Sequence, residues 1–316
     1  MRAEAKRDHG GNLDAAIAEH GGARSDWTDL STGINPVPYP VGDIPANAWT
    51  ALPDRTALSA LEEAARAFWR VPPRAGVLAV PGASAAIARI PLLAQPGRVC
   101  IPGPTYNEHA ASFRAAGWQV TETGAATDAS VHVHPNNPDG RFWRASDLSG
   151  HLRIIDESFC DVAPDRSLIA EAETPGTLVL KSFGKFWGLA GVRLGFVIGD
   201  PVLLEALAGM LGPWSVSGPA IDIGRAALVD TGWAEATRDR LAQDAGRLDR
   251  IITREGAEMV GGTPLFRLYR VANAKDWQDR LAAEHIWSRI FPYDDTWLRL
   301  GLPDGDGFDR IESVFA

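Results

Sequence analysis

Short runs of apolar and β-branched residues recur along the first two thirds of the chain, each bounded by Gly, Pro, Asn or Asp. The runs lie at 77–80, 99–101, 131–134, 154–155, 177–180 and 196–198. Helical or loop segments separate most of them. Continuous apolar strands that alternate with helices are typical of a largely parallel sheet covered on both faces. The sequence therefore predicts an α/β fold, in which the last of these strands follows a Gly-rich segment and could run antiparallel.

The pattern changes after Pro201, where longer helical segments and a few further strands are expected. The helices are expected at 202–211, 220–229, 234–255 and 276–285, and the strands at 265–271 and 297–300. Helices with a few strands suggest a second, smaller α+β domain. We therefore predict a large domain over residues 41–218, a smaller domain over 219–316, and an N-terminal arm over 1–40 that contributes to the smaller domain.

The charge and cysteine content of the chain limit its partners and its compartment. The 316 residues include 31 Lys and Arg against 40 Asp and Glu, a net charge of −9. Nucleic acids and anionic membranes require a basic face, so neither is an expected partner. Two cysteines, Cys100 and Cys160, are too few for a disulfide framework and indicate a reducing compartment. The sequence shows neither a signal-peptide pattern nor an uncharged apolar stretch of about 18 residues, so we expect a cytoplasmic protein without a membrane span.

Functional groups of open α/β sheets lie in the loops after the carboxyl ends of the strands. Ala83 and Ser84 follow the first expected strand in a run of small residues, where backbone N–H groups could hold an anion at a helix N-terminus. Tyr106 lies on a proline-stiffened loop after the second strand and is a candidate platform for a planar ring. Taken alone, each position is more typical of an ordinary turn or a packed surface tyrosine.

Polar residues also follow the next two expected strands. Asn136 and Asn137 stand between two prolines, where an amide could be aimed at a ligand oxygen, although asparagine also favours turns for local reasons. Asp156 follows the apolar pair at 154–155, and a carboxylate there is costly to bury unless it is paired. Its partner could be a basic side chain of the protein or a cationic nitrogen of a ligand.

The most specific segment is 181–195, which reads KSFGKFWGLAGVRLG. A lysine held among aromatic and small residues is poorly solvated, which lowers its pKa and makes the amine a nucleophile toward a carbonyl carbon. Lys185 has such neighbours, and Arg193 could clamp a phosphate with two hydrogen bonds. A solvated surface lysine is the general alternative. Farther along the chain, Arg299 lies between apolar residues, so it needs an anionic partner, either a substrate carboxylate or an acid of the protein.

In this order, the segments resemble fold-type I pyridoxal-phosphate enzymes of the aminotransferase superfamily, over nearly the whole chain. The resemblance rests on the Asn-Asn-Pro-x-Gly run at 136–140, the Asp-Glu pair at 156–157 and the Ser-x-x-Lys…Arg run from Ser182. Three further segments resemble the threonine-phosphate decarboxylases of cobalamin biosynthesis, which are close relatives of the histidinol-phosphate aminotransferases. These segments are His-Gly-Gly-Asn at 9–12, Ser-Thr-Gly-Ile-Asn-Pro at 31–36 and the run at 212–220.

The resemblance implies a mostly parallel central sheet between helices, a smaller α+β domain, and pyridoxal 5'-phosphate as cofactor without a metal. It implies that Lys185 forms the covalent bond to the cofactor's aldehyde, and that Asp156 pairs with the pyridine nitrogen so that the ring withdraws electrons. The other implied cofactor contacts are Asn137 at the phenolic oxygen, Tyr106 on the ring face, and Ala83, Ser84, Ser182 and Arg193 at the phosphate. For the substrate, the implied contacts are Arg299 and Asn35 at the carboxylate and His9 at the phosphate.

Phe159 departs from the pattern of many relatives, which carry a tyrosine three residues after the aspartate. That tyrosine donates to the phenolic oxygen of the cofactor, so its loss should alter the protonation of the bond between the cofactor and Lys185. The departure counts mildly against a generic aminotransferase, and an apolar residue there is unsurprising in the decarboxylase branch.

The reaction implied is decarboxylation of L-threonine O-3-phosphate to (R)-1-aminopropan-2-yl phosphate. A histidinol-phosphate-type aminotransferase is the first alternative. The second is a non-catalytic partner in attachment of the aminopropanol group, against which the retention of Lys185 and Asp156 argues. The resemblance also implies a homodimer, in which Tyr39 lies on an arm that could reach the neighbouring subunit.

Overall fold

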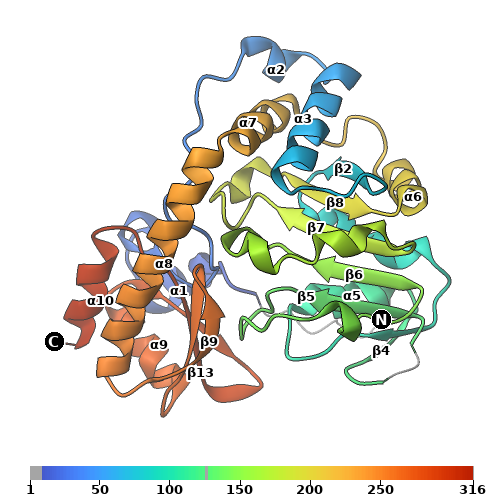
Figure 1. The fold of residues 1–316 in the computed structure, drawn as a ribbon. Coiled ribbons are helices and arrows are strands. Elements are labelled where there is room, and N and C mark those ends of the chain that lie inside the picture. Colours follow the sequence, from blue (N-terminus) through green and yellow to red (C-terminus); the bar gives the residue numbers. More distant parts are fainter. Residues whose placement is uncertain (1–8, 125–126, 316) are drawn as a thin grey trace. The chain divides into compact units, whose positions relative to one another are not determined.

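The computed structural model describes residues 9–124 and 127–315 (Figure 1). The chain forms two compact units, one of Pro38–Arg238 and one that combines the residues up to Val37 with those from Asp239 onward. The division lies within α8 (Thr231–Arg254) and not at the expected boundary near residue 218. The reason is that α7 (Gly218–Val229) packs against α3 (Arg55–Phe68) of the larger unit.

The larger unit is built on a seven-stranded sheet in the order β2-β8-β7-β6-β5-β3-β4 (Figure 1). Only β8 runs antiparallel to its neighbours in this sheet. This confirms the predicted α/β fold and the antiparallel direction of its last strand. The strands are β2 (Gly76–Val80), β3 (Arg98–Cys100), β4 (Gln119–Thr121), β5 (Ala129–Val133), β6 (Leu152–Asp156), β7 (Thr177–Ser182) and β8 (Gly195–Gly199).

Strands β7 and β8 form a hairpin, paired from Leu178 with Gly199 to Ser182 with Gly195. Antiparallel neighbours can be joined directly, whereas parallel strands need a long crossover. The connection, residues 183–194, therefore projects from the carboxyl end of β7. It carries both Lys185 and Arg193.

The helices of the larger unit are α2 (Ala46–Thr50), α3, α4 (Ala83–Ile87), α5 (Asn107–Ala115), α6 (Pro201–Leu211) and α7. Asp54 caps α3 by accepting a hydrogen bond from the Ala57 amide at 2.7 Å. A Cβ atom on Gly218 would come within 2.2 Å of the Ala48 carbonyl oxygen, so glycine permits the close approach of α7 to α2. Among the described residues, no helix is both long and apolar enough to cross a bilayer.

The two faces of the large sheet differ in polarity. One face carries Val131, Ile154 and Leu180, which belong to the main apolar core. Side chains alternate along a strand, so the residues next to them, His132 and Lys181 among them, point to the opposite face. Both faces are buried along these strands. The opposite face therefore holds ionisable groups away from water.

His132 makes the stability of this unit depend on pH. It is 3% exposed, its ring lies edge-on to Trp143 at 4.7 Å, and burial lowers its pKa to about 4. The unfolded chain, with an ordinary histidine pKa near 6.5, takes up a proton that the folded chain does not. We expect His132 alone to lower the free energy of unfolding by about 3 kcal/mol between pH 6.5 and pH 4.

Urea denaturation at both pH values measures this loss. A His132→Leu variant should lose correspondingly less stability on acidification, whereas a variant of the exposed His151 should behave as the parent protein does. Equal pH dependence in the His132→Leu variant and the parent would contradict the assignment.

The smaller unit contains an antiparallel sheet in the order β12-β13-β10-β9, and a parallel pair, β1 with β11. Its strands are β1 (Thr28–Asp29), β9 (Glu258–Thr263), β10 (Phe266–Arg270), β11 (Ile286–Trp287), β12 (Arg289–Phe291) and β13 (Asp294–Gly301). Its helices include α1 (Leu13–His20), α9 (Ala274–Ala283) and α10 (Gly307–Phe315). Leu13 and Ala16 of α1 pack with Trp27 and with Ala282 of α9.

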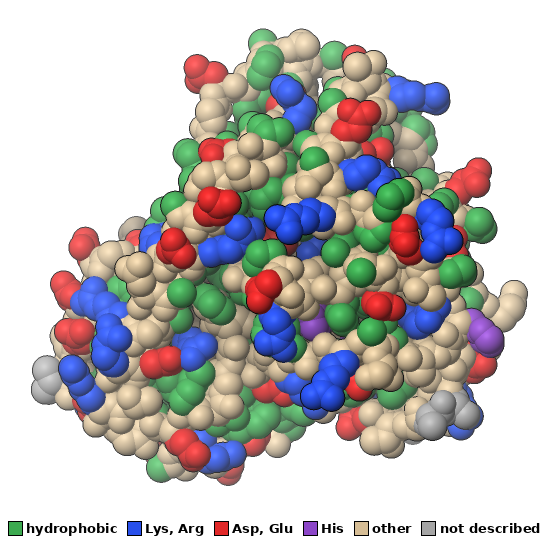
Figure 2. All heavy atoms as spheres, viewed as in Figure 1, with side chains coloured by type: hydrophobic (Ala, Val, Ile, Leu, Met, Phe, Trp, Pro, Cys, Tyr) green, Lys and Arg blue, Asp and Glu red, His purple; other side chains and the backbone are tan. Residues whose placement is uncertain are grey.

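Figure 2 shows acidic and basic side chains interspersed over one face of the molecule.

Candidate active site

Asp156, at the carboxyl end of β6, is a buried carboxylate held by three hydrogen bonds. It is 2% exposed. Its Oδ2 lies 2.8 Å from Nε2 of His109, and its Oδ1 accepts from the Ser158 amide at 3.0 Å and the Ser158 hydroxyl at 2.5 Å. Burial alone would raise the pKa of Asp156, but the hydrogen bond and charge of His109, followed by the bonds from Ser158, lower it below its ordinary value.

The lowered pKa keeps Asp156 ionised at neutral pH. Because the folded pKa lies below that of the unfolded chain, this carboxylate stabilises the fold above its ordinary pKa. The stabilisation is lost as the pH falls through the folded value. An ionised acid that is sealed from water can keep a ligand's ring nitrogen protonated.

His109 was not predicted from the sequence. It is buried on α5, three residues after Tyr106, and the rings of Tyr106 and His109 lie edge to face at 6.1 Å. Burial, and next the charge of Asp156, raise the pKa of Tyr106 to about 12. Arg193 also acts on Tyr106, in the opposite direction. Tyr106 therefore lies within electrostatic range of both Asp156 and Arg193.

Lys185 lies in a turn after β7 whose backbone is closed by hydrogen bonds from the Gly188 amide to the Lys185 carbonyl (3.1 Å) and from the Leu189 amide to the Phe183 carbonyl (3.0 Å). Its Nζ lies 5.1 Å from the centre of the Phe159 ring. Phe159 follows Asp156 by three residues and is 4% exposed. The structure thus brings the segments of Lys185 and Asp156 to the same place.

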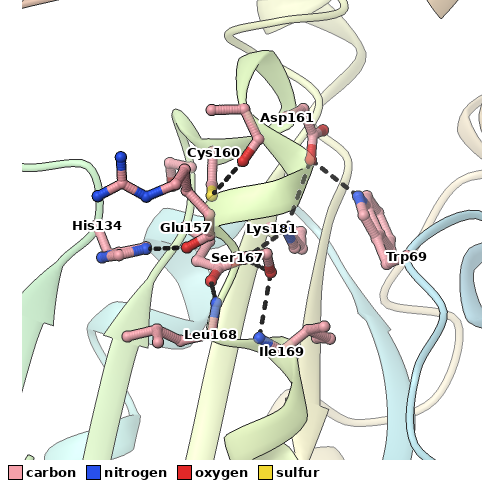
Figure 3. A network of polar contacts seen from close by, with 12 residues as sticks. Trp69, His134, Glu157, Cys160, Asp161, Ser167, Leu168, Ile169 and Lys181 are labelled. Carbon is pink, nitrogen blue, oxygen red and sulfur yellow. Dashed lines mark hydrogen bonds and ion pairs between the residues drawn. The ribbon is translucent and has the colours of Figure 1, made fainter. Parts of the chain in front are cut away.

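Lys181, the other lysine of this segment, is in a different environment. It is 2% exposed, and its Nζ lies 2.6 Å from Oε2 of Glu157 (Figure 3). Burial alone would lower the pKa of Lys181, but Glu157 and Asp161 raise it above its ordinary value. A buried lysine held as a cation is a poor nucleophile. Of the two lysines, Lys185 is therefore the better candidate for reaction with a carbonyl.

The predicted phosphate contacts surround the start of α4. Ala83 and Ser84 open this helix, and a Cβ atom on Gly82 would come within 2.7 Å of Nη2 of Arg193. Gly82 has φ +82°, a conformation that L side chains rarely adopt. Ser182 accepts a hydrogen bond from the Gly184 amide at 3.2 Å. The guanidinium and the backbone amides around this cradle suit a phosphate group.

Asn136 ties together the two loops that carry Tyr106 and Asn137. Its side chain donates to the Pro104 carbonyl at 3.0 Å and accepts from the Thr105 hydroxyl at 2.6 Å. Asn136 is fully buried, whereas Asn137 is half-buried. Of the two amides, Asn136 therefore has a structural role, and Asn137 remains the candidate for a ligand oxygen.

The predicted substrate contacts belong to the smaller unit. Arg299, on β13, is 4% exposed, lies over the Phe266 ring at 5.3 Å and donates to the Ser31 carbonyl. The Gly11 amide donates to the Ser31 hydroxyl at 2.7 Å, so the segment of the exposed His9 also lies against Ser31. Asn35 is buried, and its Oδ1 accepts from Nη2 of Arg240 at 2.6 Å.

Arg289 was not predicted from the sequence, although it lies directly opposite Arg299 in the pairing of β12 with β13. Burial, and next the charge of Arg289, lower the pKa of Arg299 to about 10. Two like charges opposite each other on neighbouring strands are unfavourable. An anionic ligand between or beside them would relieve this repulsion.

The cofactor predicted from the sequence fits the residues of the larger unit. The end of β6 supplies a buried carboxylate for a ring nitrogen, the β7–β8 connection supplies an amine, and the Gly82–Arg193 cradle supplies donors for a phosphate. These are the three kinds of group that pyridoxal phosphate requires.

Comparisons with known proteins point the same way. The sequence model of the family "Aminotransferase class I and II" matches residues 45–307. The chain is 40% identical to a threonine-phosphate decarboxylase of Sinorhizobium sp, covering 98% of this chain and 97% of that protein. It is 39% identical to one of Pseudomonas aeruginosa, with 97% and 96% covered, and 26% identical to histidinol-phosphate aminotransferase 3 of Mesorhizobium japonicum, with 89% and 84% covered.

Solved structures of similar fold include a histidinol-phosphate aminotransferase of Sinorhizobium meliloti in complex with pyridoxal-5'-phosphate. It has a TM-score of 0.79 at 16% identity, and the match covers 100% of this chain and 99% of that one. The L-threonine-O-3-phosphate decarboxylase of Porphyromonas gingivalis has a TM-score of 0.74 at 18% identity, with 90% and 97% covered. At these identities the likeness shows a shared fold.

Proposed function

The chain belongs to the family of class I and II aminotransferases, and on that premise we propose that it is a pyridoxal-phosphate-dependent decarboxylase of L-threonine O-3-phosphate. The observation that carries the proposal is the full-length likeness to two threonine-phosphate decarboxylases at 39–40% identity. The histidinol-phosphate aminotransferase of Mesorhizobium japonicum is more distant, at 26%. The product is (R)-1-aminopropan-2-yl phosphate, as the resemblance of the sequence to the enzymes of cobalamin biosynthesis implies.

Each predicted site residue has a role in this reaction. Bound pyridoxal phosphate supplies a ring that withdraws electrons from the substrate Cα. Lys185 provides the amine that holds the cofactor and later returns a proton to Cα, and Asp156 keeps the ring nitrogen protonated. The other proposed cofactor contacts are Asn137 at the phenolic oxygen, Tyr106 against the ring, and Ala83, Ser84, Ser182 and Arg193 at the phosphate.

The bond that breaks is decided by the orientation of the substrate. A bond to the substrate Cα breaks most readily when it stands perpendicular to the plane of the cofactor ring. The groups that orient the substrate therefore select the bond that breaks. We assign the substrate carboxylate to Arg299 and Asn35, and the substrate phosphate to His9. Arg289 adds a second positive charge beside Arg299. A second cation beside Arg299 strengthens the attraction of this place for the substrate carboxylate.

Phe159 distinguishes this site from that of a generic aminotransferase. Its ring, without a hydroxyl, lies against the Lys185 amine at 5.1 Å. The aromatic face favours a cation but donates no hydrogen bond. The absence of the tyrosine hydroxyl departs from the generic aminotransferase pattern and agrees with the decarboxylase branch.

Product analysis tests the proposed function. The purified protein, supplied with pyridoxal phosphate and L-threonine O-3-phosphate, should release CO₂ and aminopropanol phosphate without any keto acid. Turnover that depends stoichiometrically on 2-oxoglutarate would instead identify a histidinol-phosphate-type aminotransferase. A protein with no absorbance near ~420 nm after cofactor addition would support the non-catalytic alternative, since a lysine-bound cofactor absorbs in that region.

Arg299→Ala should raise KM for L-threonine O-3-phosphate by about thirtyfold or more, because a buried charge contact to the substrate is worth several kcal/mol. Steady-state kinetics measure the change. The matched control is Arg270→Ala, which removes an exposed arginine of the same sheet that pairs with Glu258. An unchanged KM in Arg299→Ala would return this arginine to a structural role.

We further propose that the enzyme works as a homodimer in the cytoplasm. Within this chain, the Tyr39 amide donates to the Trp187 carbonyl at 2.9 Å, and its ring meets those of Trp187 and Trp233 edge to face. Tyr39 therefore lies against the turn that carries Lys185 of its own chain, and the support for a dimer is the resemblance of the sequence to the aminotransferase superfamily. Light scattering after size-exclusion chromatography measures the oligomeric state, and a monomeric mass for the active enzyme would contradict the dimer.

A further inference from the structure

A network of buried charges lies around Lys181, on the face of the large sheet opposite the main apolar core (Figure 3). Lys181 Nζ lies 2.6 Å from Oε2 of Glu157 and 3.6 Å from Oδ1 of Asp161. Glu157 also accepts from the Ser167 hydroxyl at 2.7 Å and the Leu168 amide at 2.6 Å. All three charged residues are at most 4% exposed. Among the described residues, no other lysine or arginine lies within salt-bridge distance of either carboxylate.

The network reaches the Lys185 turn through Trp187. Asp161 accepts from the Trp187 indole N–H at 3.2 Å and from the Trp69 indole N–H at 2.8 Å. Trp187 is fully buried, and its ring stacks on Phe183 at 5.1 Å and on Trp233 at 5.3 Å. The indole nitrogen is the only polar atom of that side chain. Trp187 anchors the Lys185 turn in the core, and the Asp161 carboxylate supplies the polar contact that orients the Trp187 side chain.

The same network holds the segment of Asp156, because Glu157 is the next residue in the chain. The Lys181 ammonium thus contacts both carboxylates directly, while Arg238 donates to the Asp161 backbone carbonyl at 2.7 Å and adds a second positive charge near Asp161. Glu157 is next to Asp156 in the chain, and Asp161 holds Trp187 of the turn that carries Lys185. Buried charges of one sign without a partner are strongly unfavourable, so removal of the ammonium forces protonation of an acid or entry of water.

We propose that Lys181 is a positioning residue, which holds Glu157 and Asp161 in place and thereby fixes the Lys185 turn relative to Asp156. Lys181 takes no part in the chemistry. The inference rests on the proposed function, since that function makes Lys185 the reacting amine.

A cavity borders the Lys181 side chain. Its volume is about 320 Å³, and its walls include Lys181, Asp161, Trp69 and Arg238. Exposed residues such as Asp165 and Thr231 also line it, so it opens to solvent. A small alkylammonium ion could therefore enter and replace a shortened Lys181 side chain.

The first test measures hydrogen exchange of backbone amides in the protein without cofactor. Lys181→Met should speed exchange across residues 183–189 by about tenfold or more, because the turn loses its anchor. Lys181→Arg, which keeps the charge, should exchange as the parent does. The matched control is Lys275→Met, which removes an exposed lysine paired with Asp279. Parent-like exchange at 183–189 in a folded Lys181→Met protein would overturn the proposal.

Chemical rescue provides the second test. Propylammonium replaces the part of the side chain that Lys181→Ala removes, and it should restore slow exchange at 183–189 and recover kcat with little change in KM. Propanol at the same concentration should do neither. Equal effects of propanol and propylammonium would overturn the proposal. If Lys181→Met and Lys181→Ala both fail to fold, Asp161→Asn keeps the shape of the network, and it should loosen residues 183–189 in the same way.

Failure of the proposed function would look different. Borohydride trapping of pyridoxal phosphate at another lysine would overturn the role of Lys185 and leave the exchange result intact. Trapping at Lys185 with unchanged exchange in Lys181→Met would overturn only the positioning role.

Discussion

Replacement of Lys185 by alanine should leave a folded protein that has no measurable turnover and carries no covalently attached pyridoxal phosphate after borohydride reduction. The side-chain amine is the nucleophile in the proposed mechanism, and loss of a nucleophile typically costs roughly ten-thousandfold or more in rate. Lys185 is only partly buried, so its removal leaves no uncompensated charge in the core. The melting temperature of the variant should therefore change little.

Mass spectrometry of the reduced and digested protein locates the adduct. In the parent protein the adduct should lie on the peptide that contains Lys185. Lys275→Ala, which removes an exposed lysine of α9, should keep both the adduct and the activity. An adduct on Lys181 would refute the assignment, and it would also contradict the ion pair that this lysine makes with Glu157.

Asp156→Asn should lower turnover on the order of a thousandfold, while the affinity for pyridoxal phosphate falls much less. A neutral amide cannot hold a proton on the pyridine nitrogen, so the ring withdraws electrons poorly. The phosphate cradle around Gly82 and Arg193 is unchanged in this variant, and it should retain the cofactor. Absorbance titration measures the affinity, and CO₂ release measures the turnover.

His109 provides an intermediate test of the same charge. His109→Gln removes the charge that helps to lower the pKa of Asp156, so turnover should fall by about tenfold. The matched control for Asp156→Asn is Asp54→Asn, which removes a carboxylate of the same unit and preserves the helix cap. Undiminished turnover in Asp156→Asn would contradict the role of this acid in the reaction.

The sheet of the larger unit could be predicted from the sequence because its signal is local. Six of its seven strands are short apolar runs with turn residues on both sides, and the Gly-rich connection before β8 indicated an antiparallel return. The seventh, β4, was missed because it has only three residues, two of them polar. In the smaller unit β1, β9, β11 and β12 were missed, and β1 and β11 have only two residues each. Gly261 and Gly262 weaken the strand pattern of β9, and β12 is only three residues long.

Contacts between distant segments could not be predicted from the sequence. His109 meets Asp156 across 47 positions, and Trp69 meets Asp161 across 92. Arg289 is an ordinary charged residue until its register opposite Arg299 is known. Residues with a proposed chemical role, such as Asp156 and Lys185, follow strands and belong to recognisable motifs. Residues that contact them, such as His109, are identified only from the packed structure.

The hairpin of β7 and β8 has a consequence for how this enzyme can change during evolution. Lys185 and Arg193 share one short connection, so an insertion or deletion there displaces the amine and the phosphate clamp together. We therefore expect insertions and deletions in this segment to be tolerated less well than substitutions of the residues between Lys185 and Arg193. Laboratory libraries that diversify this enzyme should keep the spacing between the two side chains constant and randomise the residues around them.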